Sequence, residues 1–401
     1  MSSSSSSGGS ARRGTRRRLL LAVSSREKLR RRFNQRGLDR IEEALEGYKE
    51  GLARRRFTLR VAFLDDASSM SAFGLKPTRR ITDVSAKSAI DRLIGKLAKS
   101  PGTSISVLLL GGGEVIPYFR LSNPTRDSDA SVPTDNPYGC KPGAVTAEKC
   151  LLPERPVGRM PDGNGSSVKL LVTQIENAAK ASTLLPGAKT ALGYTAAVWK
   201  KASQQVWSEL GWKGTLRVSP PLSYVDVKAS WFKRKDCLYF NLHGSDREPH
   251  WFGQKGVSFT TALSPANVRR FNRRESVVLT EACYGAIEMR RKKETSIALS
   301  FLSSGSLCMV GSTCVAYGAL VPPLSEADLI ALHFFGNVKK GMPVGEALLN
   351  ARAQLAASAI SRQGYLDDDD RKTLLQFVLF GDPTLRIQPH SLGSDKDAKD
   401  A

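Results

Sequence analysis

Two residues that together can cleave an amide bond follow two largely apolar runs in the second half of the chain. Residues 237–242 lead to His243, and residues 276–280 lead shortly afterwards to Cys283. A thiolate is a strong nucleophile, and a neutral imidazole can take the thiol proton and later return it to the leaving amine. The pair therefore predicts a cysteine nucleophile with a histidine base.

Small residues beside the two candidates leave room for a peptide backbone. Gly244 follows His243, and its N–H can point at a developing oxyanion together with the N–H of Cys283. Ala282 and Gly285 add little bulk around the thiol. We therefore expect an oxyanion hole built from the backbone of Gly244 and Cys283.

An inert interpretation has to be weighed for every cysteine. A buried cysteine is more often a core residue than a nucleophile, and Cys237, Cys308 and Cys314 fit that description because each lies in or beside an apolar run. Cys283 and His243 differ, since both stand where a strand leaves the core with a glycine close behind. Ligands of open parallel sheets bind at such strand ends. The joint pattern favours catalysis.

The rest of the sequence predicts an α/β protein with mainly parallel sheets flanked by helices, because apolar runs alternate with amphipathic stretches. We expect strands at residues 19–23, 59–64, 105–110, 190–196, 237–242, 276–280 and 307–311. The main helices are expected at residues 27–51, 86–98, 167–184, 203–210, 295–302, 326–338 and 344–357. Residues 114–160 predict a long irregular loop, a kind of segment that is usually functional or mobile.

This pattern predicts two side-by-side α/β subdomains. The expected organisation is a disordered, Ser-rich basic tail at 1–16, an N-terminal subdomain at 17–185, a catalytic subdomain at 186–390 and a polar tail at 391–401. A serine–glycine run cannot bury enough apolar area to offset the entropy of ordering, which is why the first segment is expected to be disordered.

Charge is unevenly distributed along the chain. The net charge is +22, and residues 1–60 hold 17 Lys+Arg against 6 Asp+Glu, or +11 (17 − 6). Such a region can bind nucleic acid, anionic lipid, an activator or another acidic partner. Aromatic residues are almost absent from the basic run, so an ordinary charged surface is favoured over nucleic-acid binding. No apolar stretch reaches the roughly 18 residues of a membrane-spanning helix, so no span is expected.

No cofactor, metal site or disulfide framework is expected. The six cysteines include no Cys-x-x-Cys pair, and the four histidines do not occur at zinc-ligand spacing. Six cysteines in 401 residues are too few for a disulfide scaffold. The apolar run at residues 19–23 is too short for the core of a signal peptide, and we therefore expect a cytoplasmic protein.

Several segments resemble the gingipain-type cysteine peptidases of the caspase-like clan. The segment Glu281-Ala282-Cys283-Tyr284-Gly285 is close to the caspase pattern Gln-Ala-Cys-x-Gly, whose histidine lies about 50 residues upstream. The closer, gingipain-type resemblance rests on residues 107–118, 134–139, 156–160, 311–313, 345–348 and 380–385. It covers roughly residues 17–388, in order.

The resemblance implies a caspase-hemoglobinase fold and endopeptidase activity on protein or peptide substrates, with both catalytic residues in the second subdomain. By position, residues 311–317 line the substrate cleft, and a tryptophan covers it. The substrate-binding residues are then Ser312, Thr313, Tyr317 and Trp251.

Two features of this catalytic unit depart from the family or are left open. Well-known gingipains carry carboxylates after the first strand of the second subdomain, but residues 193–201 hold none, so Arg or Lys specificity is not expected. The group that orients His243 could be Asp246, Glu248 or a backbone carbonyl. The expected role is a regulated intracellular protease in signalling or defence. The alternatives are a catalytically silent scaffold and a nucleic-acid-binding protein that uses the basic N-terminal region.

Overall fold

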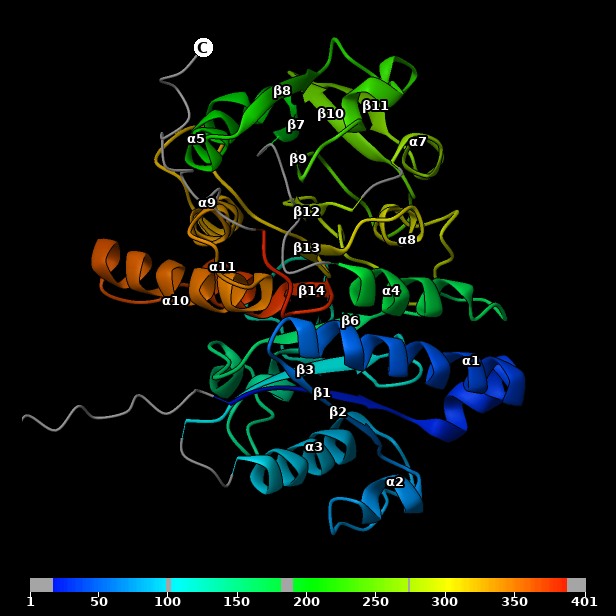
Figure 1. Ribbon diagram of the computed structural model, residues 1–401. Helices are drawn as coiled ribbons and strands as arrows, with labels where there is room; N and C mark the ends of the chain where they lie inside the picture. The colour runs from blue at the N-terminus through cyan, green and yellow to red at the C-terminus, as the bar shows by residue number, and fades with distance from the viewer. Residues whose placement is uncertain (1–16, 99–101, 182–189, 273–274, 388–401) are drawn as a thin grey trace, which may run out of the picture.

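One mixed sheet of ten strands runs through the computed structural model, which describes residues 17–98, 102–181, 190–272 and 275–387 (Figure 1). In sheet order the strands are β2 (Thr58–Phe63), β1 (Arg18–Ser24), β3 (Ser104–Leu110), β6 (Val157–Met160), β14 (Phe377–Gly381), β13 (Cys308–Ser312), β12 (Val277–Thr280), β9 (Cys237–Asn241), β7 (Thr190–Ala196) and β8 (Lys213–Ser219). Both halves of the chain therefore share one sheet. The expected boundary at 185/186 and the expected tails at 1–16 and 391–401 lie outside the described residues.

Helices cover both faces of this sheet (Figure 1). One face carries α1 (Arg26–Arg54), α4 (Lys169–Lys180), α7 (Pro265–Phe271) and α8 (Ile297–Ser303). The other carries α5 (Lys200–Leu210), α9 (Glu326–Lys339), α10 (Val344–Gln363) and α11 (Asp368–Gln376). The first half of the chain also forms α2 (Ala67–Ser71) and α3 (Asp83–Leu97), and the second half adds α6 (Ala229–Phe232). No helix in the described ranges is long and apolar enough to cross a membrane.

The strands that position the candidate site are buried on both faces. Every residue of β9, β12 and β13 is buried, and the three strands run parallel with β12 in the middle. Nearly continuous apolar runs such as Val277–Thr280 are typical of parallel strands that helices cover on both sides. The polar residues that follow these strands therefore emerge together at one edge of the sheet.

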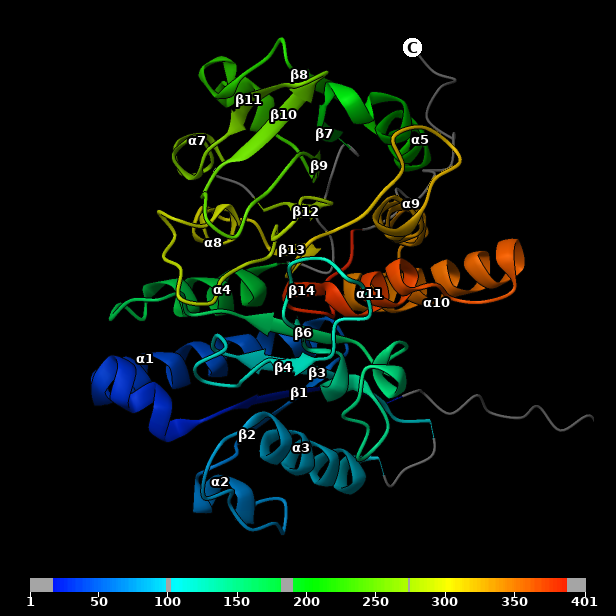
Figure 2. The same cartoon turned by 180° about the vertical axis from the view of Figure 1, so that it is seen from behind.

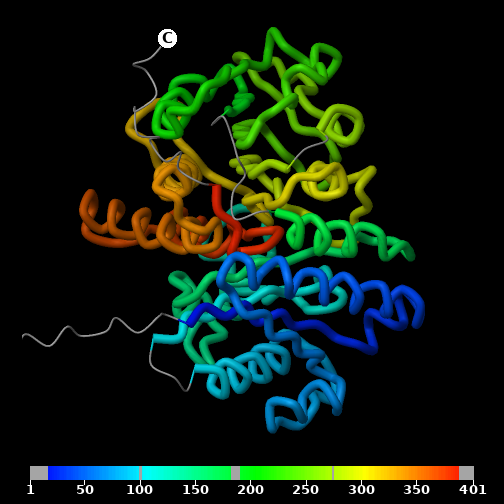
Figure 3. Tube along the Cα trace, in the orientation of Figure 1, coloured from blue at the N-terminus to red at the C-terminus, as the bar shows by residue number. Residues whose placement is uncertain are grey.

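The last strand of the chain joins the two halves of the sheet. β14, red in Figure 3, pairs antiparallel with β13 and parallel with β6. The first-half strands β1, β2, β3 and β6 are parallel to one another, so they run opposite to β7, β9, β12 and β13. As a result, the amino end of β6 lies at the same edge as the carboxyl ends of β12 and β13.

This reversal brings a first-half loop to the candidate site. Because β3 and β6 are parallel, residues 111–156 must return from the carboxyl end of β3 to the amino end of β6. On the way they form the small hairpin of β4 (Phe119–Leu121) and β5 (Val132–Thr134). Figure 2 shows the cyan segment after β4 passing beside β13 and α11. The long loop expected from the sequence therefore reaches the edge from which the candidate nucleophile emerges.

The predicted strands and main helices are all present, with shifted ends. Among the elements of the second half that the prediction missed, besides helices such as α6 and α7, two are strands or strand pairs. One is the edge strand β8. The other is the hairpin of β10 (Trp251–Lys255) and β11 (Ser258–Leu263), which is joined by two residues. Exposed polar residues interrupt the apolar pattern of both hairpin strands, so neither gives a long apolar run.

Candidate active site

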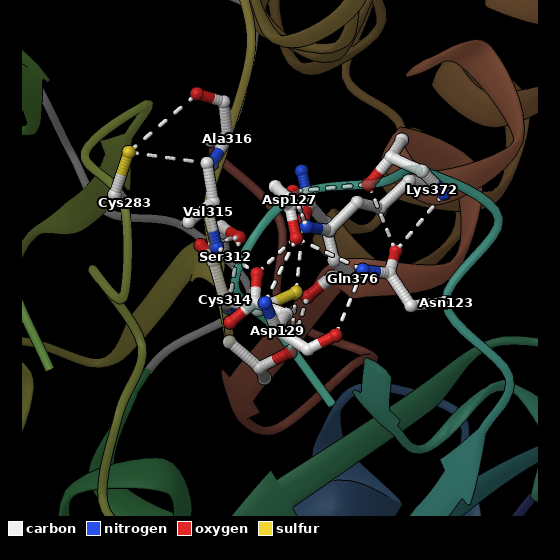
Figure 4. Close-up of polar contacts among 12 residues, drawn as sticks. Asn123, Asp127, Asp129, Cys283, Ser312, Cys314, Val315, Ala316, Lys372 and Gln376 are labelled. Carbon is white, nitrogen blue, oxygen red and sulfur yellow. Dashed lines mark hydrogen bonds and ion pairs between the residues drawn. The ribbon is translucent and has the colours of Figure 1, made fainter. Parts of the chain in front are cut away.

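Cys283 lies at the carboxyl edge of the sheet, three residues beyond the end of β12 (283 − 280). Its half-buried sulfur accepts a hydrogen bond from the Ala316 backbone N at 3.3 Å and lies 3.5 Å from the Ala316 carbonyl oxygen (Figure 4). Burial raises the pKa of the Cys283 thiol, and the Ala316 N–H partly offsets that effect. The sulfur is therefore a neutral thiol until a base takes its proton.

The turn that presents Cys283 is anchored to the segment that follows β13. The Tyr284 N–H donates to the Cys314 carbonyl at 2.9 Å, and the Ala286 N–H donates to the Ser312 carbonyl at 2.8 Å. Tyr284 has a φ of 54°, which is an uncommon backbone conformation for a bulky residue. The two hydrogen bonds hold this conformation, so the position of the thiol depends on the loop after β13.

His243 lies two residues beyond β9 and is held by the β10–β11 hairpin. Its backbone exchanges two hydrogen bonds with Phe252, at 2.8 and 2.9 Å. The centroid of its ring is 4.2 Å from that of Trp199 and 5.1 Å from that of Phe259. Its Nε2 atom is 2.7 Å from Oε1 of Gln254. The imidazole is thus fixed by backbone, aromatic and amide contacts, none of which carries a charge.

The two candidates emerge from neighbouring strands in the same register. Phe240 of β9 pairs with Thr280 of β12, so each candidate stands three residues beyond one pair (243 − 240 and 283 − 280). Gly244 allows the two segments to pack together, because a Cβ placed on it would lie 2.0 Å from the carbonyl oxygen of Cys283. No hydrogen bond joins the thiol to the imidazole, both of which are among the described residues.

A buried ionic cluster stands behind the thiol (Figure 4). The Asp129 carboxylate accepts hydrogen bonds from the Tyr284 hydroxyl at 2.6 Å, the Val315 N–H at 2.8 Å and the Lys372 ammonium at 2.6 Å. Lys372 is fully buried and also bonds to Asp127. Burial lowers the pKa of Lys372, but the bonds to Asp127 and Asp129 outweigh that effect, and Lys372 stays charged. Asp129 thereby connects the 111–156 loop to the turn that presents Cys283 and to the loop after β13.

Lys372 supplies the positive charge that pairs with the two carboxylates of this loop. Asn123 completes the loop by donating to the Asp127 carboxylate and to the Asp129 carbonyl, each at 2.9 Å. In the part of the chain that the structure describes, no group of three or more His, Cys, Asp or Glu residues is arranged to hold a metal ion.

Two of the expected substrate-binding residues are buried at the end of β13 and at the start of the loop that follows it. The Ser312 hydroxyl donates to the Cys314 carbonyl at 2.8 Å. The Thr313 hydroxyl donates to the Pro133 carbonyl at 2.6 Å. Ser312 and Thr313 are almost inaccessible to solvent, at 0 % and 2 % exposure, so both hydroxyls form their hydrogen bonds within the protein.

The other two expected substrate-binding residues lie in different surroundings. Tyr317 is half-buried, and its hydroxyl donates to Asp127. Trp251 is only 4 % exposed and packs in the core, with its ring centroid 5.3 Å from that of Phe240. The ring that lies over the imidazole is instead that of Trp199.

Neither carboxylate that the sequence offered as a partner of His243 bonds to it in the described structure. Asp246 is engaged through its carbonyl by Arg291, and Glu248 lies 3.9 Å from His250. The side chain that bonds to the His243 ring is instead that of Gln254. Sequence reasoning missed Gln254 because it missed the hairpin, although the alternation around a Gly256 turn was a signal for one.

Two buried carboxyl groups lie next to the nucleophile segment. Glu281 accepts a hydrogen bond from the Tyr239 hydroxyl at 2.7 Å, and Asp328 of α9 accepts one from the Ala319 N–H at 2.6 Å. Burial and the charge of Asp328 raise the pKa of Glu281 well above its usual value. Burial raises the pKa of Asp328 to about 6. The pair therefore holds a proton at mildly acidic pH.

Comparisons with known proteins identify the family to which the chain belongs. Peptidase family C25 matches the sequence over residues 52–388, so the chain belongs to this family of cysteine peptidases. The expected gingipain-type relationship is thereby confirmed. No curated protein sequence matches the chain.

Solved structures agree on the fold. The crystal structure of the Arg-specific cysteine proteinase gingipain R has a TM-score of 0.59 at 15 % identity, over 94 % of this chain and 79 % of that one. The complex of the Porphyromonas gingivalis RgpB pro- and mature domains has a TM-score of 0.62 at 14 % identity, over 92 % of this chain and 79 % of that one. The caspase-like fold class expected from the sequence is confirmed.

Proposed function

We propose that the chain is an active cysteine endopeptidase in which Cys283 is the nucleophile and His243 is the base. The observation that carries this proposal is the shared register of β9 and β12, which sets both residues three positions beyond one strand pair. The fit of Gly244 against the Cys283 carbonyl supports it, because the missing side chain lets the two segments approach closely.

The proposed reaction is acyl transfer through the sulfur. The imidazole of His243 takes the proton of the Cys283 thiol, and the thiolate forms a C–S bond with the carbonyl carbon of the peptide. The imidazolium then gives that proton to the amine nitrogen as the C–N bond breaks. Water, deprotonated by the same imidazole, cleaves the thioester and releases the acid, which restores the thiol.

The expected oxyanion hole is supported by two backbone donors that no other residue uses. Neither the Gly244 N–H nor the Cys283 N–H donates to another residue of the described chain. A preorganised donor that no other residue occupies can bond to the oxyanion as it forms, which is where such groups contribute most. We therefore assign both N–H groups to the tetrahedral intermediate.

The substrate backbone is expected to meet residues 315–317. The N–H and carbonyl of Ala316 contact the resting thiol, and a bound peptide is expected to take over these two groups. Ser312 and Thr313 shape this loop from below through their buried hydroxyls, and Tyr317 holds its far end through Asp127.

We place the enzyme in the cytoplasm, as a protease whose activity is regulated in signalling or defence. All six cysteines are free, which fits a reducing compartment in which Cys283 stays a thiol. Regulation is supported by the dependence of the thiol on contacts with a first-half loop.

The proposal is tested by incubating a diverse peptide library with the wild-type protein and with Cys283→Ala and His243→Ala, and reading the products by mass spectrometry. Cleavage by the wild type alone supports the assignment and also reports the sequence preference. Equal cleavage by wild type and Cys283→Ala would contradict the assignment of Cys283 as the nucleophile. If no protein cleaves, a thiol-reactive peptidyl inhibitor separates the remaining cases. Labelling of Cys283 then indicates a latent enzyme, and failure to label it indicates a silent scaffold.

A further inference from the structure

One polar side chain beside the imidazole has no role in the proposed reaction so far. Gln254 lies on β10, eleven residues beyond His243, in a hairpin that was not predicted from the sequence. We infer that Gln254 is a positioning residue, which keeps the imidazole proton of His243 on Nε2 and leaves Nδ1 to exchange protons with the Cys283 thiol. This inference rests on the proposed function.

The orientation of the Gln254 amide is set by a second hydrogen bond. Its Nε2 group donates to the Gly256 carbonyl at 2.8 Å, which acts as an acceptor only. The amide nitrogen is therefore turned toward Gly256, and the amide oxygen faces the imidazole at 2.7 Å. A carbonyl oxygen can only accept, so the facing Nε2 of His243 must carry the proton. The network thus selects one tautomer of the neutral ring.

The other ring nitrogen is then free for chemistry. In the neutral tautomer set by Gln254, Nδ1 holds the lone pair, and no residue of the described chain bonds to it. A base needs an unoccupied lone pair to take the thiol proton. Nδ1 therefore receives the proton from sulfur and later hands it to the leaving amine, while Nε2 keeps its own proton throughout.

Packing prevents the ring from turning over. Trp199 and Phe259 contact the imidazole, with centroids 4.2 and 5.1 Å away, and Phe252 fixes the backbone of His243 by two hydrogen bonds. A ring flip would move the lone pair toward Gln254 and away from the site. The rings therefore help Gln254 to hold the reactive nitrogen in place.

The neutrality of Gln254 decides the resting state of the pair. The side chains that face the imidazole from β10, β11 and the segment after β7 are Gln254, Phe259 and Trp199, and none is charged. Burial lowers the pKa of His243, and the bond to Gln254 only partly offsets this. A carboxylate in the same place would stabilise the imidazolium instead. With glutamine, a neutral thiol and a neutral imidazole coexist until substrate arrives.

Two substitutions at Gln254 and two matched controls test this role. Gln254→Leu removes the acceptor, and Gln254→Glu replaces it by a charged one. Asp246→Asn and Glu248→Gln alter the carboxylates on the same loop as His243 that do not bond to it. Two readouts apply to all five proteins. They are kcat and KM on a library peptide, and the pH dependence of Cys283 alkylation by iodoacetamide, followed by mass spectrometry.

We expect Gln254→Leu to lower kcat about 10- to 100-fold with little change in KM, the scale of a misaligned general base. Gln254→Glu should move the midpoint of alkylation to lower pH by about one unit, since a carboxylate favours the imidazolium and hence the thiolate. Asp246→Asn and Glu248→Gln should match the wild type in both readouts. A purely structural role for Gln254 would lower the melting temperature without moving the alkylation midpoint.

Two results would overturn the inference. One is an alkylation midpoint that is the same in Gln254→Glu and wild type. The other is a loss of kcat in Asp246→Asn or Glu248→Gln that equals or exceeds the loss in Gln254→Leu. If the wild type cleaves no peptide, the proposed function fails, but the alkylation profiles of the folded variants still decide whether Gln254 governs the proton on His243.

Discussion

The two members of the candidate dyad are held by different kinds of contact. The thiol side is supported by a buried ammonium and two carboxylates, Lys372, Asp127 and Asp129. The imidazole side is supported by the neutral residues Gln254 and Trp199 together with other rings of its surroundings. The sequence separations differ as well. Asp129 lies 155 residues from Tyr284 and 243 from Lys372, whereas Gln254 lies 11 from His243.

This contrast indicates that the nucleophile, more than the base, depends on the whole chain. The base is positioned by the β10–β11 hairpin and by the ring of Trp199, all of which come from the second half of the chain. The nucleophile needs the 111–156 loop from the first half and α11 from near the end of the chain. Substitutions on the two sides should therefore differ in their effects on stability and on activity.

The largest effect is expected for Lys372→Met, which removes the buried ammonium and leaves two facing carboxylates. Breaking a buried pair from one side costs about 3–5 kcal/mol of unfolding free energy, because the remaining charges are uncompensated. Urea denaturation measures this, with Gln254→Leu as the matched variant on the neutral side, where about 1 kcal/mol is expected for a single hydrogen bond. Similar losses in both variants would remove the contrast between the two sides.

A smaller effect, of opposite sign, is expected at the carboxyl pair beside the nucleophile. The pKa of Asp328 is about 6 in the folded protein, above the ordinary 3.8, so the protonated form is the one that folding favours. Its stabilisation is fully present below the unfolded pKa and is lost as the pH rises through about 6. Asp328→Asn cannot ionise and should be more stable than wild type at pH 8, because the protein no longer has to bury that negative charge.

Thermal and urea unfolding between pH 4 and pH 8 provide the measurement for this pair. The wild type should lose stability across that range, and Asp328→Asn should lose less. Glu281→Gln is the matched variant, because it neutralises the coupled partner and should flatten the profile in the same direction. Parallel curves for wild type and Asp328→Asn would show that the buried pair does not control the pH dependence.

The sequence was sufficient for those parts of the molecule that depend on local pattern. The strands that end at His243 and Cys283 are apolar runs with polar residues directly behind them, and Gly244 follows at once. Because parallel strands share a carboxyl edge, the pattern alone brought these residues to one edge. The register that aligns them, Phe240 with Thr280, could not be read from either segment by itself.

The parts that could not be predicted depend on distant segments or on an irregular pattern. β14 runs antiparallel to β13 and parallel to β6, and this change of direction brings the first-half loop to the catalytic edge. No local signal in the sequence reveals the direction of a neighbouring strand. Asp129 and Lys372 therefore look like ordinary charged residues in the sequence. Trp251 was expected over the cleft and lies in the core, because the side chains of β10 alternate between its two faces.

A moderate loss of activity is expected when Asp129 loses its charge. Asp129→Asn weakens the bonds to Tyr284 and Val315, which fix the turn and the loop on either side of the thiol. We expect kcat to fall about tenfold, the equivalent of one hydrogen bond in the transition state. Asp127→Asn is the comparison variant, because it loses its bonds to Lys372 and Tyr317 but does not contact Tyr284 or Val315. An equal fall in both variants would mean that the ion pair, and not the anchoring of the turn, supports catalysis.

The smallest effect is expected for Phe259→Ala, which removes one ring from the neutral side. Phe259 is 60 % exposed, so its loss should change the unfolding free energy by only about 0.5 kcal/mol. The backbone bridge to Phe252, the amide of Gln254 and the ring of Trp199 still hold the imidazole, so kcat should stay within about threefold. Trp199→Ala, which removes the closer and less exposed ring, should cost more in the same peptide assay. If Phe259→Ala proves the more damaging of the two, the hairpin ring is the main support of the base, and the neutral side is less redundant than its geometry indicates.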